Sequence, residues 1–264
     1  MLIEESLFGV INKEELAIKR CIEFQNRNEN NQNILAFSGG KDSIVAYDIL
    51  KRSGIKFKPI YSPPSVDPPE LIRFIDKYYP EVYKQPYAKN KKGQEITMWS
   101  LLRNRALPPT RLMRYCCDVL KERTGVEGDT VFTGVRWSES TGRSKQSMVG
   151  FWKKKIMVRP IIDFTDEDIW EYIHKYNLPY CELYDKGWER IGCIGCPLSS
   201  VSQIKELEAY PKYKENYIRA LEGMIEYRKS KGMETNWKTG VDVYNWWTNQ
   251  VKNEKVIEGQ CSMF

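Results

Sequence analysis

Six consecutive residues have the side chains and backbone freedom that a phosphate-binding turn needs. They are Ser38-Gly39-Gly40-Lys41-Asp42-Ser43. Glycine lets the backbone approach phosphate oxygens closely and point its N–H groups at them. Two hydroxyls and an ammonium group can complete the contacts, and Asp42 can cap helix amides or hold Mg²⁺ beside the phosphates of ATP. The spacing is not that of the Walker loop. The alternative is a glycine-rich helix cap that binds no ligand.

The segments around this turn predict that it joins a strand to a helix. Ile34–Phe37 is a short apolar run typical of a buried parallel strand. Apolar residues then recur at helical spacing from Ile44 to Leu50, and a helix start adds partial positive charge. Strand-like and helix-like segments continue to alternate, at 58–61, 70–79, 82–83, 130–133, 156–158 and 166–176. This alternation predicts an α/β fold with a doubly wound parallel sheet covered on both faces.

The same patterns predict three consecutive parts. Residues 1–30 form an N-terminal helix, from about Glu4 to Asn26, with a polar linker. Residues 31–200 form the nucleotide-binding domain, and residues 201–264 form a helical extension and a tail. Aromatic and basic residues mix in the extension, and we interpret them as packed helix faces, with nucleic-acid binding as the alternative. The run Lys153–Lys155 is expected to be a solvated or phosphate-steering charge patch.

The bulk composition is that of an ordinary folded protein. Hydrophobic residues make up 41% and charged residues 29% of the 264 positions, which disfavours disorder. Apolar runs are too short for a bilayer, and no signal peptide is recognisable, so we expect a cytoplasmic protein without a membrane partner. The net charge of +6 suits anionic substrates, nucleotides and nucleic acid alike. The single histidine, His174, excludes a His-rich zinc site.

Four sequence blocks together resemble one enzyme family. The phosphate turn is similar to the PP-loop of the phosphoadenosine phosphosulfate (PAPS) reductase family and of related ATP pyrophosphatases, within the adenine nucleotide alpha-hydrolase-like superfamily. Residues 134–140 look like its Gly-x-Arg-x-x-x-Ser segment, and 160–170 resemble its Pro-Ile-x-Asp-Trp-Thr-x-x-Asp-Val-Trp stretch. Residues 178–187 resemble the Leu-Pro-x-x-x-Leu-Tyr-x-x-Gly segment that follows.

The resemblance implies a substrate and candidate site residues. An adenylyl nucleotide, either PAPS, adenylyl sulfate or ATP, would bind at the carboxyl ends of the strands. Arg136 would face phosphate or sulfate through its guanidinium, and Lys121 falls where relatives have a lysine beside the substrate. Arg143 and Arg159 are weaker candidates. The nucleotide-binding set implied is Ser38, Gly39, Gly40, Lys41, Asp42, Ser43, Gly134, Arg136 and Ser140.

Four of the seven cysteines form two close pairs, Cys116-Cys117 and Cys193-Ile194-Gly195-Cys196. Adenylyl-sulfate reductases of the resembling family hold a 4Fe–4S cluster with such pairs, and four thiolates suit that cluster. Four thiolates suit structural zinc as well, although zinc knuckles favour a two-residue gap over adjacent cysteines. We expect a 4Fe–4S cluster, with zinc or unligated thiols as the alternatives.

The chain departs from the resembling reductases at their nucleophile. Their cysteine lies in a Glu-Cys-Gly-Leu-His segment, whereas this sequence has Cys261 in Gly259-Gln260-Cys261-Ser262-Met263. Cys261 is thus a candidate nucleophile for sulfonucleotide reduction, with thioredoxin as the reductant. The second hypothesis is ATP-dependent sulfur transfer to nucleic acid, by DNA phosphorothioation or tRNA thiolation, with a cysteine desulfurase as partner. The third is a non-enzymatic nucleotide- or DNA-binding module with structural zinc.

The last residues suggest one protein partner. Gln260-Cys261-Ser262-Met263-Phe264 is similar to the Gln-x-Ser/Asp-Leu-Phe peptide that docks on bacterial sliding clamps. Apolar anchors on a short segment fit a small groove, as in many peptide complexes. The alternative is a frayed tail.

Overall fold

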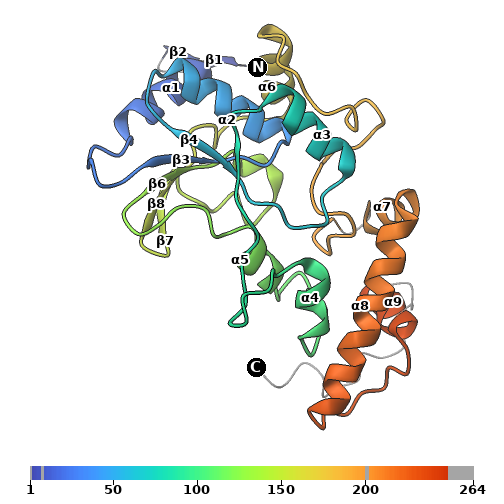
Figure 1. Ribbon diagram of the computed structural model, residues 1–264. Helices are drawn as coiled ribbons and strands as arrows, with labels where there is room; N and C mark the ends of the chain where they lie inside the picture. The colour runs from blue at the N-terminus through green and yellow to red at the C-terminus, as the bar shows by residue number, and fades with distance from the viewer. Residues whose placement is uncertain (1, 7–8, 200–201, 249–264) are drawn as a thin grey trace. The chain divides into compact units, whose positions relative to one another are not determined.

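The computed structural model describes residues 2–6, 9–199 and 202–248 (Figure 1). The chain divides into two compact units that interleave along the sequence. Unit 1 comprises residues 1–63, 67–86 and 121–192, and unit 2 comprises residues 64–66, 87–120 and 193–264. The sequence suggested three consecutive parts, whereas here the excursion 87–120 groups with the C-terminal residues.

Unit 1 is built on a six-stranded sheet. Its strands, in spatial order, are β5 (Tyr83–Lys84), β4 (Lys58–Tyr61), β3 (Asn33–Ala36), β6 (Thr130–Phe132), β8 (Lys155–Val158) and β7 (Val149–Trp152). The chain winds outward from β3 to β5 and then returns to β6 on the other side of β3, so its direction reverses between β3 and β6. The predicted α/β fold with a parallel sheet is confirmed, with one exception.

The exception is the edge strand β7, which the sequence patterns did not predict. It runs antiparallel to β8 in a hairpin, with Trp152 opposite Lys155. The interpretation of Lys155 as a solvated charge was wrong, because its side chain is buried and its Nζ donates to the Thr124 carbonyl at 2.7 Å. Strand pairing turns this one lysine inward while the turn keeps its two neighbours exposed.

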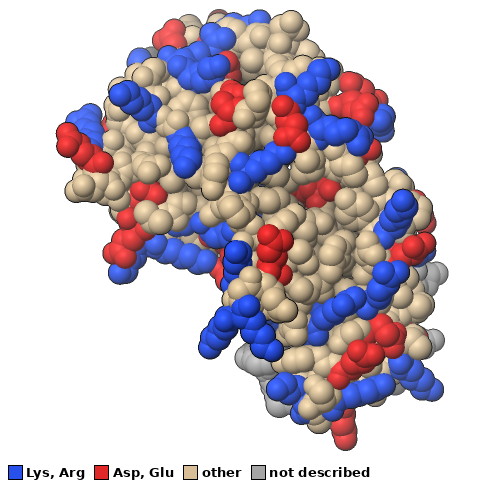
Figure 2. Space-filling view, viewed as in Figure 1, with Lys and Arg blue, Asp and Glu red and all other residues tan. Residues whose placement is uncertain are grey.

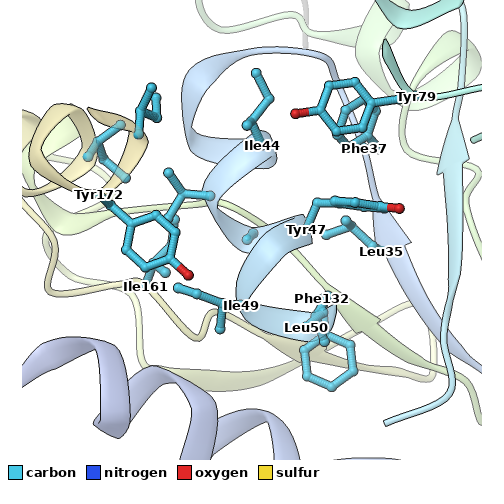
Figure 3. Close-up of a cluster of buried hydrophobic side chains, with 14 of the residues drawn as sticks. Leu35, Phe37, Ile44, Tyr47, Ile49, Leu50, Tyr79, Phe132, Ile161 and Tyr172 are labelled. Atoms are coloured by element: carbon cyan, nitrogen blue, oxygen red, sulfur yellow. The ribbon is translucent and has the colours of Figure 1, made fainter. Parts of the chain in front are cut away.

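In the described part of unit 1, four helices accompany the sheet: α1 (Lys13–Glu23), α2 (Lys41–Arg52), α3 (Pro69–Tyr78) and α6 (Asp166–Lys175). Helix α2 packs against both α1 and α6. Figure 3 shows its side chains among Leu35 and Phe132 of the sheet and Tyr172 of α6. Ile44 and Leu50 of α2 are fully buried. Because α2 is buried on several sides, the turn at its start is fixed relative to the sheet.

Helix α6 begins where the sequence predicted. The Thr165 hydroxyl accepts from the Asp168 amide at 3.2 Å, and the Asp168 carboxylate accepts from the Thr165 amide at 2.8 Å. This reciprocal capping box satisfies amides that a helix start leaves unpaired. It holds the neighbouring Asp166 in the first turn, which matters for the site described below.

The expected N-terminal helix from Glu4 was partly wrong. Residues Ile3–Ser6 (β1) and Gly9–Asn12 (β2) pair as an antiparallel hairpin, and α1 begins only at Lys13. The Asn12 side chain caps α1 by accepting from the Glu14 amide at 3.1 Å. Apolar and charged residues alternate in this stretch at a period that suits strands as well as helices, so only the cap marks the boundary.

Unit 2 is helical, with α4 (Met98–Arg103), α5 (Tyr115–Leu120), α7 (Ser202–Ala209), α8 (Pro211–Ser230) and α9 (Gly240–Trp247). The Tyr217 ring lies 5.0 Å from that of Trp99 and 4.9 Å from that of Trp247, in a second hydrophobic core. The packing interpretation of these aromatic residues is confirmed. No helix in the described part of the chain combines the length and hydropathy of a membrane span.

A buried ion pair ties α1 to α6. Lys13 Nζ lies 2.7 Å from Asp168 Oδ2, and both side chains are buried. Replacing Lys13 with Met should lower the free energy of unfolding by about 3 kcal/mol, because Asp168 keeps its buried charge and loses this cation. Urea denaturation measures the change. Lys19→Met, at an exposed position of the same helix, is the control, and an equal effect of both substitutions would contradict the prediction.

Candidate functional site

The phosphate turn lies at the carboxyl edge of the sheet, between β3 and the start of α2. This is the point where the winding reverses, which is where open α/β sheets bind ligands. Gly39 has a φ of +74°, and a Cβ there would lie 2.8 Å from Leu71 and 2.9 Å from Ile75 of α3. Glycine is therefore needed both for the left-handed backbone and for close packing on α3.

The loop after β6 contacts the turn through a second glycine. A Cβ at Gly134 would lie 2.7 Å from the carbonyl carbon and oxygen of Asp42. Such a distance is not tolerated, so the absence of a side chain at Gly134 permits this backbone approach. The structure thus brings Gly134 and the turn together, while a nucleotide-binding role for Gly134 stays a prediction.

The two serines of the turn bond within the turn itself. The Ser43 hydroxyl donates to the Gly40 carbonyl at 2.8 Å and accepts from the Ser38 amide at 3.2 Å. The Ser38 hydroxyl donates to Ser43 Oγ at 3.1 Å. These bonds hold the loop in shape, since helix α2 has no side-chain cap at Gly40.

Lys41 contacts three residues that are distant from it in the sequence. Its backbone N–H, at the start of α2, donates to the Tyr184 hydroxyl at 2.9 Å. Its buried Nζ donates to the Glu189 carbonyl at 2.9 Å and lies 3.2 Å from Asp166 Oδ1. Tyr184 and Asp166 were not predicted as site residues. The available signal was their position in the blocks 178–187 and 160–170.

Arg136 is fully buried, with 1% of its surface exposed. Its Nε donates to Asp42 Oδ1 at 2.7 Å and its Nη2 to Asp166 Oδ1 at 3.0 Å. Its Nη1 donates to the Ser138 hydroxyl at 2.6 Å. Each of its three guanidinium nitrogens therefore donates to the protein, and the guanidinium joins the starts of α2 and α6. This geometry suits a residue that positions the turn.

The two carboxylates on Arg136 have opposite pKa shifts. Burial raises the pKa of Asp42, although Arg136 and Lys41 favour its charged form. Burial also acts to raise the pKa of Asp166, but the positive charges of Arg136 and Lys41 outweigh it and lower that pKa. Asp166 is therefore the firmly ionised counter-charge of the site.

Lys121 follows α5 in the chain and forms an ion pair with Asp67, which follows β4. Its Nζ is 3.5 Å from Asp67 Oδ1, and the other oxygen of Asp67 accepts from the Tyr61 hydroxyl at 2.5 Å. Tyr61 is the last residue of β4, the neighbour of β3. Lys121 is thus held beside the strand next to the phosphate turn.

The remaining candidates of unit 1 lie in the segment after Arg136. Ser140 is exposed, and its backbone carbonyl accepts from the amides of Arg143 and Ser144 at 2.9 and 3.0 Å. Arg143 forms an ion pair with Glu139. Burial, together with the charge of Arg143, lowers the pKa of Arg159. These contacts organise the segment after Arg136, and a nucleotide role for Ser140 stays a prediction.

The four paired cysteines all belong to unit 2. A hydrogen bond with Cys117, burial, and the charges of Cys117, Cys193 and Cys196 raise the pKa of Cys116. The other three thiols therefore lie near enough to Cys116 to disfavour its ionisation. No disulfide joins any of the described cysteines. In residues 2–6, 9–199 and 202–248 no three Cys, His, Asp or Glu side chains are arranged as a metal-ligand group.

The Cys193–Cys196 loop is held through its backbone. The Gly195 amide donates to Glu206 at 2.9 Å, and its carbonyl accepts from Gln203 at 3.0 Å. The Ile194 carbonyl accepts from the Tyr217 hydroxyl at 2.9 Å. Gly195 has a φ of +70°, and a Cβ there would lie 2.8 Å from Leu207. Helices α7 and α8 thus fix the loop through its backbone and not through its thiols.

Cys261 and the segment 260–264 lie outside the described residues.

The sequence matches a known family over more than half of its length. Residues 32–199 match the phosphoadenosine phosphosulfate reductase domain. The phosphoadenosine 5'-phosphosulfate reductase of Xanthomonas euvesicatoria is 28% identical over 170 residues, which are 60% of this chain and 68% of that protein. The adenosine 5'-phosphosulfate reductase of Oceanobacillus iheyensis is 43% identical over 79 residues, 29% of this chain and 32% of that protein.

Other relatives are longer than this chain. Two uncharacterised proteins of Methanocaldococcus jannaschii are 25% and 29% identical over 77% and 80% of the chain. The chain spans about half of their length, 44% and 53%.

The crystal structure of phosphoadenylyl-sulfate reductase from Candida auris, in a phosphate complex, overlaps 73% of this chain and 98% of that one, with a TM-score of 0.44 and 18% identity.

The contact between Gly134 and Asp42 yields a test of the site's construction. Gly134→Ala should lower the free energy of unfolding by about 1–3 kcal/mol, because the new methyl group would push the turn away from the loop after β6. Gly142→Ala is the matched control, since nothing lies within 4 Å of a Cβ there. Thermal or urea unfolding measures both variants. Equal stability of the two would show that the close approach at Gly134 is not a constraint.

Proposed function

This chain belongs to the phosphoadenosine phosphosulfate reductase domain family, and we propose that it is an enzyme that binds an adenylyl nucleotide at the turn 38–43 for sulfur chemistry. The substrate is PAPS, adenylyl sulfate or ATP. The observation that carries the proposal is the position of the turn, between β3 and α2 at the switch point of a mostly parallel sheet. The Lys41 ammonium and the start of α2, where the N-cap residue Gly40 has no side chain to cap the helix, lie there together.

Binding would replace contacts that the protein now makes with itself. A phosphoryl oxygen would accept from the Lys41 amide in place of the Tyr184 hydroxyl, 2.9 Å away. A second oxygen would draw Lys41 Nζ from Asp166, which is 3.2 Å away. Both exchanges give a charge-assisted hydrogen bond to an anion. Arg136 would keep Asp42 in place through its bond of 2.7 Å and so act as a positioning residue.

Two reactions remain open for the bound nucleotide. Reduction needs a thiol that attacks the sulfate sulfur. Burial raises the pKa of Cys21 to about 12 and also raises that of Cys181, so neither cysteine of unit 1 supplies a reactive thiolate. Cys261, outside the described residues, is the candidate for this thiol. ATP-dependent sulfur transfer, to DNA or tRNA, needs no such nucleophile at the turn and is the second candidate. Thioredoxin, a cysteine desulfurase and a sliding clamp stay predicted partners, and a cytoplasmic location stays a prediction.

We also propose that Cys116, Cys117, Cys193 and Cys196 hold a 4Fe–4S cluster. The effect of the other three thiols on the pKa of Cys116 and the absence of disulfides among the described cysteines fit this ligand set. The 193–196 loop, which α7 and α8 hold through its backbone, would supply two of the four thiolates, and Cys116 and Cys117 would supply the other two. Such a cluster, when bound, supplies a charged redox centre. Zinc is the alternative metal.

Nucleotide binding at the turn can be measured by calorimetric titration with PAPS, adenylyl sulfate and ATP. Lys41→Met should weaken the tightest of these about ten-fold or more, because a charged hydrogen bond is lost. Lys51→Met, exposed on the same helix, is the control. No binding by the unmodified protein, or equal affinity of the Lys41 variant, would refute the assignment. Sulfite release indicates reduction, and pyrophosphate release indicates adenylylation.

The metal proposal predicts that anaerobically purified protein is brown and carries about four iron atoms per chain. Cys196→Ser should lose most of the iron and the visible absorption, since one ligand is removed. Cys181→Ser, a buried cysteine of unit 1, should retain both. Colourless protein that carries one zinc ion would replace the cluster with the zinc alternative.

A further inference from the structure

The hairpin of β7 and β8 ends in an unusual turn. Trp152 pairs with Lys155, so Lys153 and Lys154 form a two-residue loop. Their φ angles are +47° and +60°, which is the left-handed region at both positions. This is the pattern of a type I′ turn, for which Asn-Gly is strongly preferred. Lysines are strained there, and strained backbone positions of this kind cluster at functional sites.

The tip of the hairpin is held in place. The Gly128 amide donates to the Lys154 carbonyl at 3.1 Å, and Lys154 Nζ lies 3.0 Å from Glu127. Lys153 Nζ lies 5.7 Å from the centre of the Trp152 ring. The two lysines therefore sit on an anchored turn and not on a frayed one.

Two exposed aromatic side chains stand directly behind these lysines. Phe151 is 81% exposed and Trp152 is 50% exposed. As neighbours on one strand they point to opposite faces, so each side of the hairpin presents one ring. β7 is the edge strand of the sheet, so its outer side has no neighbouring strand in the described sheet (Figure 1).

Positive charge continues along β7 to its other end. There the Arg159 amide donates to the Met148 carbonyl at 2.9 Å, and its Nη1 donates to the Ser147 carbonyl at 2.9 Å. Besides burial, the positive charge of Arg143 lowers the pKa of Arg159, so the two arginines lie near each other. The strand's four residues span about 13 Å. The first residue of β7, Val149, lies at the carboxyl edge of the sheet, where the phosphate turn also lies.

The order of residues along the hairpin, with two lysines at the tip and two aromatic residues before them, favours one kind of partner over another. Charge of both signs is interspersed on the face of the molecule in Figure 2, so a general electrostatic field does not select the partner. Insertion of the two rings into a bilayer would carry the apical lysines ahead of them into the hydrocarbon, where ammonium groups are costly. A nucleic-acid strand offers phosphates to an apex of lysines and base faces to the rings behind it.

We infer that the β7–β8 hairpin, with Phe151, Trp152, Lys153 and Lys154, is a binding site for single-stranded nucleic acid. Bases stack on the two rings, and phosphates contact the two lysines. A single strand is required because a duplex hides the base faces. The strand would run along β7 toward the edge that carries the phosphate turn. This inference does not depend on which nucleotide the turn binds.

The test separates the use of the lysines from their cost to the fold. Lys153→Asn combined with Lys154→Gly keeps the turn type and relieves the strain, so it should raise the melting temperature by about 2–4 °C. The same variant should bind a fluorescent oligothymidylate or oligouridylate more weakly. Its slope of log affinity against log salt should fall by about 1.4, for two phosphate contacts to a single strand. A purely structural role predicts no change in this slope.

Two further variants complete the experiment. Phe151→Ser and Trp152→Ser, at exposed positions, should each weaken binding about five-fold or more through lost stacking. Lys91→Gln with Lys92→Gln removes two exposed charges elsewhere and should leave the salt slope unchanged. Absence of oligonucleotide binding would overturn the inference, as would equal affinity for duplex and single strand. An equal loss in the Lys91 and Lys92 control would reduce the effect to net charge. Because oligonucleotide binding is measured without adenylyl nucleotide, failure here leaves the nucleotide proposal standing.

Discussion

The site depends on one buried guanidinium. Arg136 follows β6, and its nitrogens bind Asp42 at the start of α2 and Asp166 at the start of α6. A buried charge is costly unless it is paired and hydrogen-bonded, so these partners cannot drift independently. Three segments that are distant in the sequence are thereby held at one edge of the sheet. The packing of α2 against α1, α6 and the sheet gives this arrangement a rigid support.

The site is electrostatically satisfied by the protein itself. Lys41, the group best suited to a phosphate, already meets a carbonyl, a carboxylate and a hydroxyl. A nucleotide must therefore replace these contacts, and its affinity reflects the difference between two sets of bonds. A phosphate dianion is a stronger acceptor than the groups it would replace, so the exchange favours ligand binding. A substrate with fewer phosphate charges would gain less from the exchange.

Local backbone strain is placed unevenly in the chain. Gly39 and Gly195 take left-handed conformations where a Cβ would also collide with neighbouring side chains, so glycine resolves both problems. Lys153 and Lys154 take similar conformations without that relief. At the two glycines the left-handed conformation permits close packing, whereas at the two lysines it places charged side chains at an exposed tip.

The sequence by itself determined the turn, its strand and its helix, because glycine content, apolar runs and the Thr165 cap are local signals. It also determined the α/β class and the family to which the chain belongs. It did not reveal the hairpin strand β7, which is short and contains a glycine, or the inward position of Lys155, because strand pairing decides both.

Only the tertiary structure decided which groups complete the site. Tyr184 lies 143 residues from Lys41 in the sequence, and the hydrogen bond between them depends on how whole segments pack. Likewise the sequence proposed that Arg136 faces a ligand, whereas the fold supplies it with carboxylates from two helix starts. Periodicity and motif spacing describe contacts within one element. Contacts between loop ends arise from long-range packing, which no local pattern encodes.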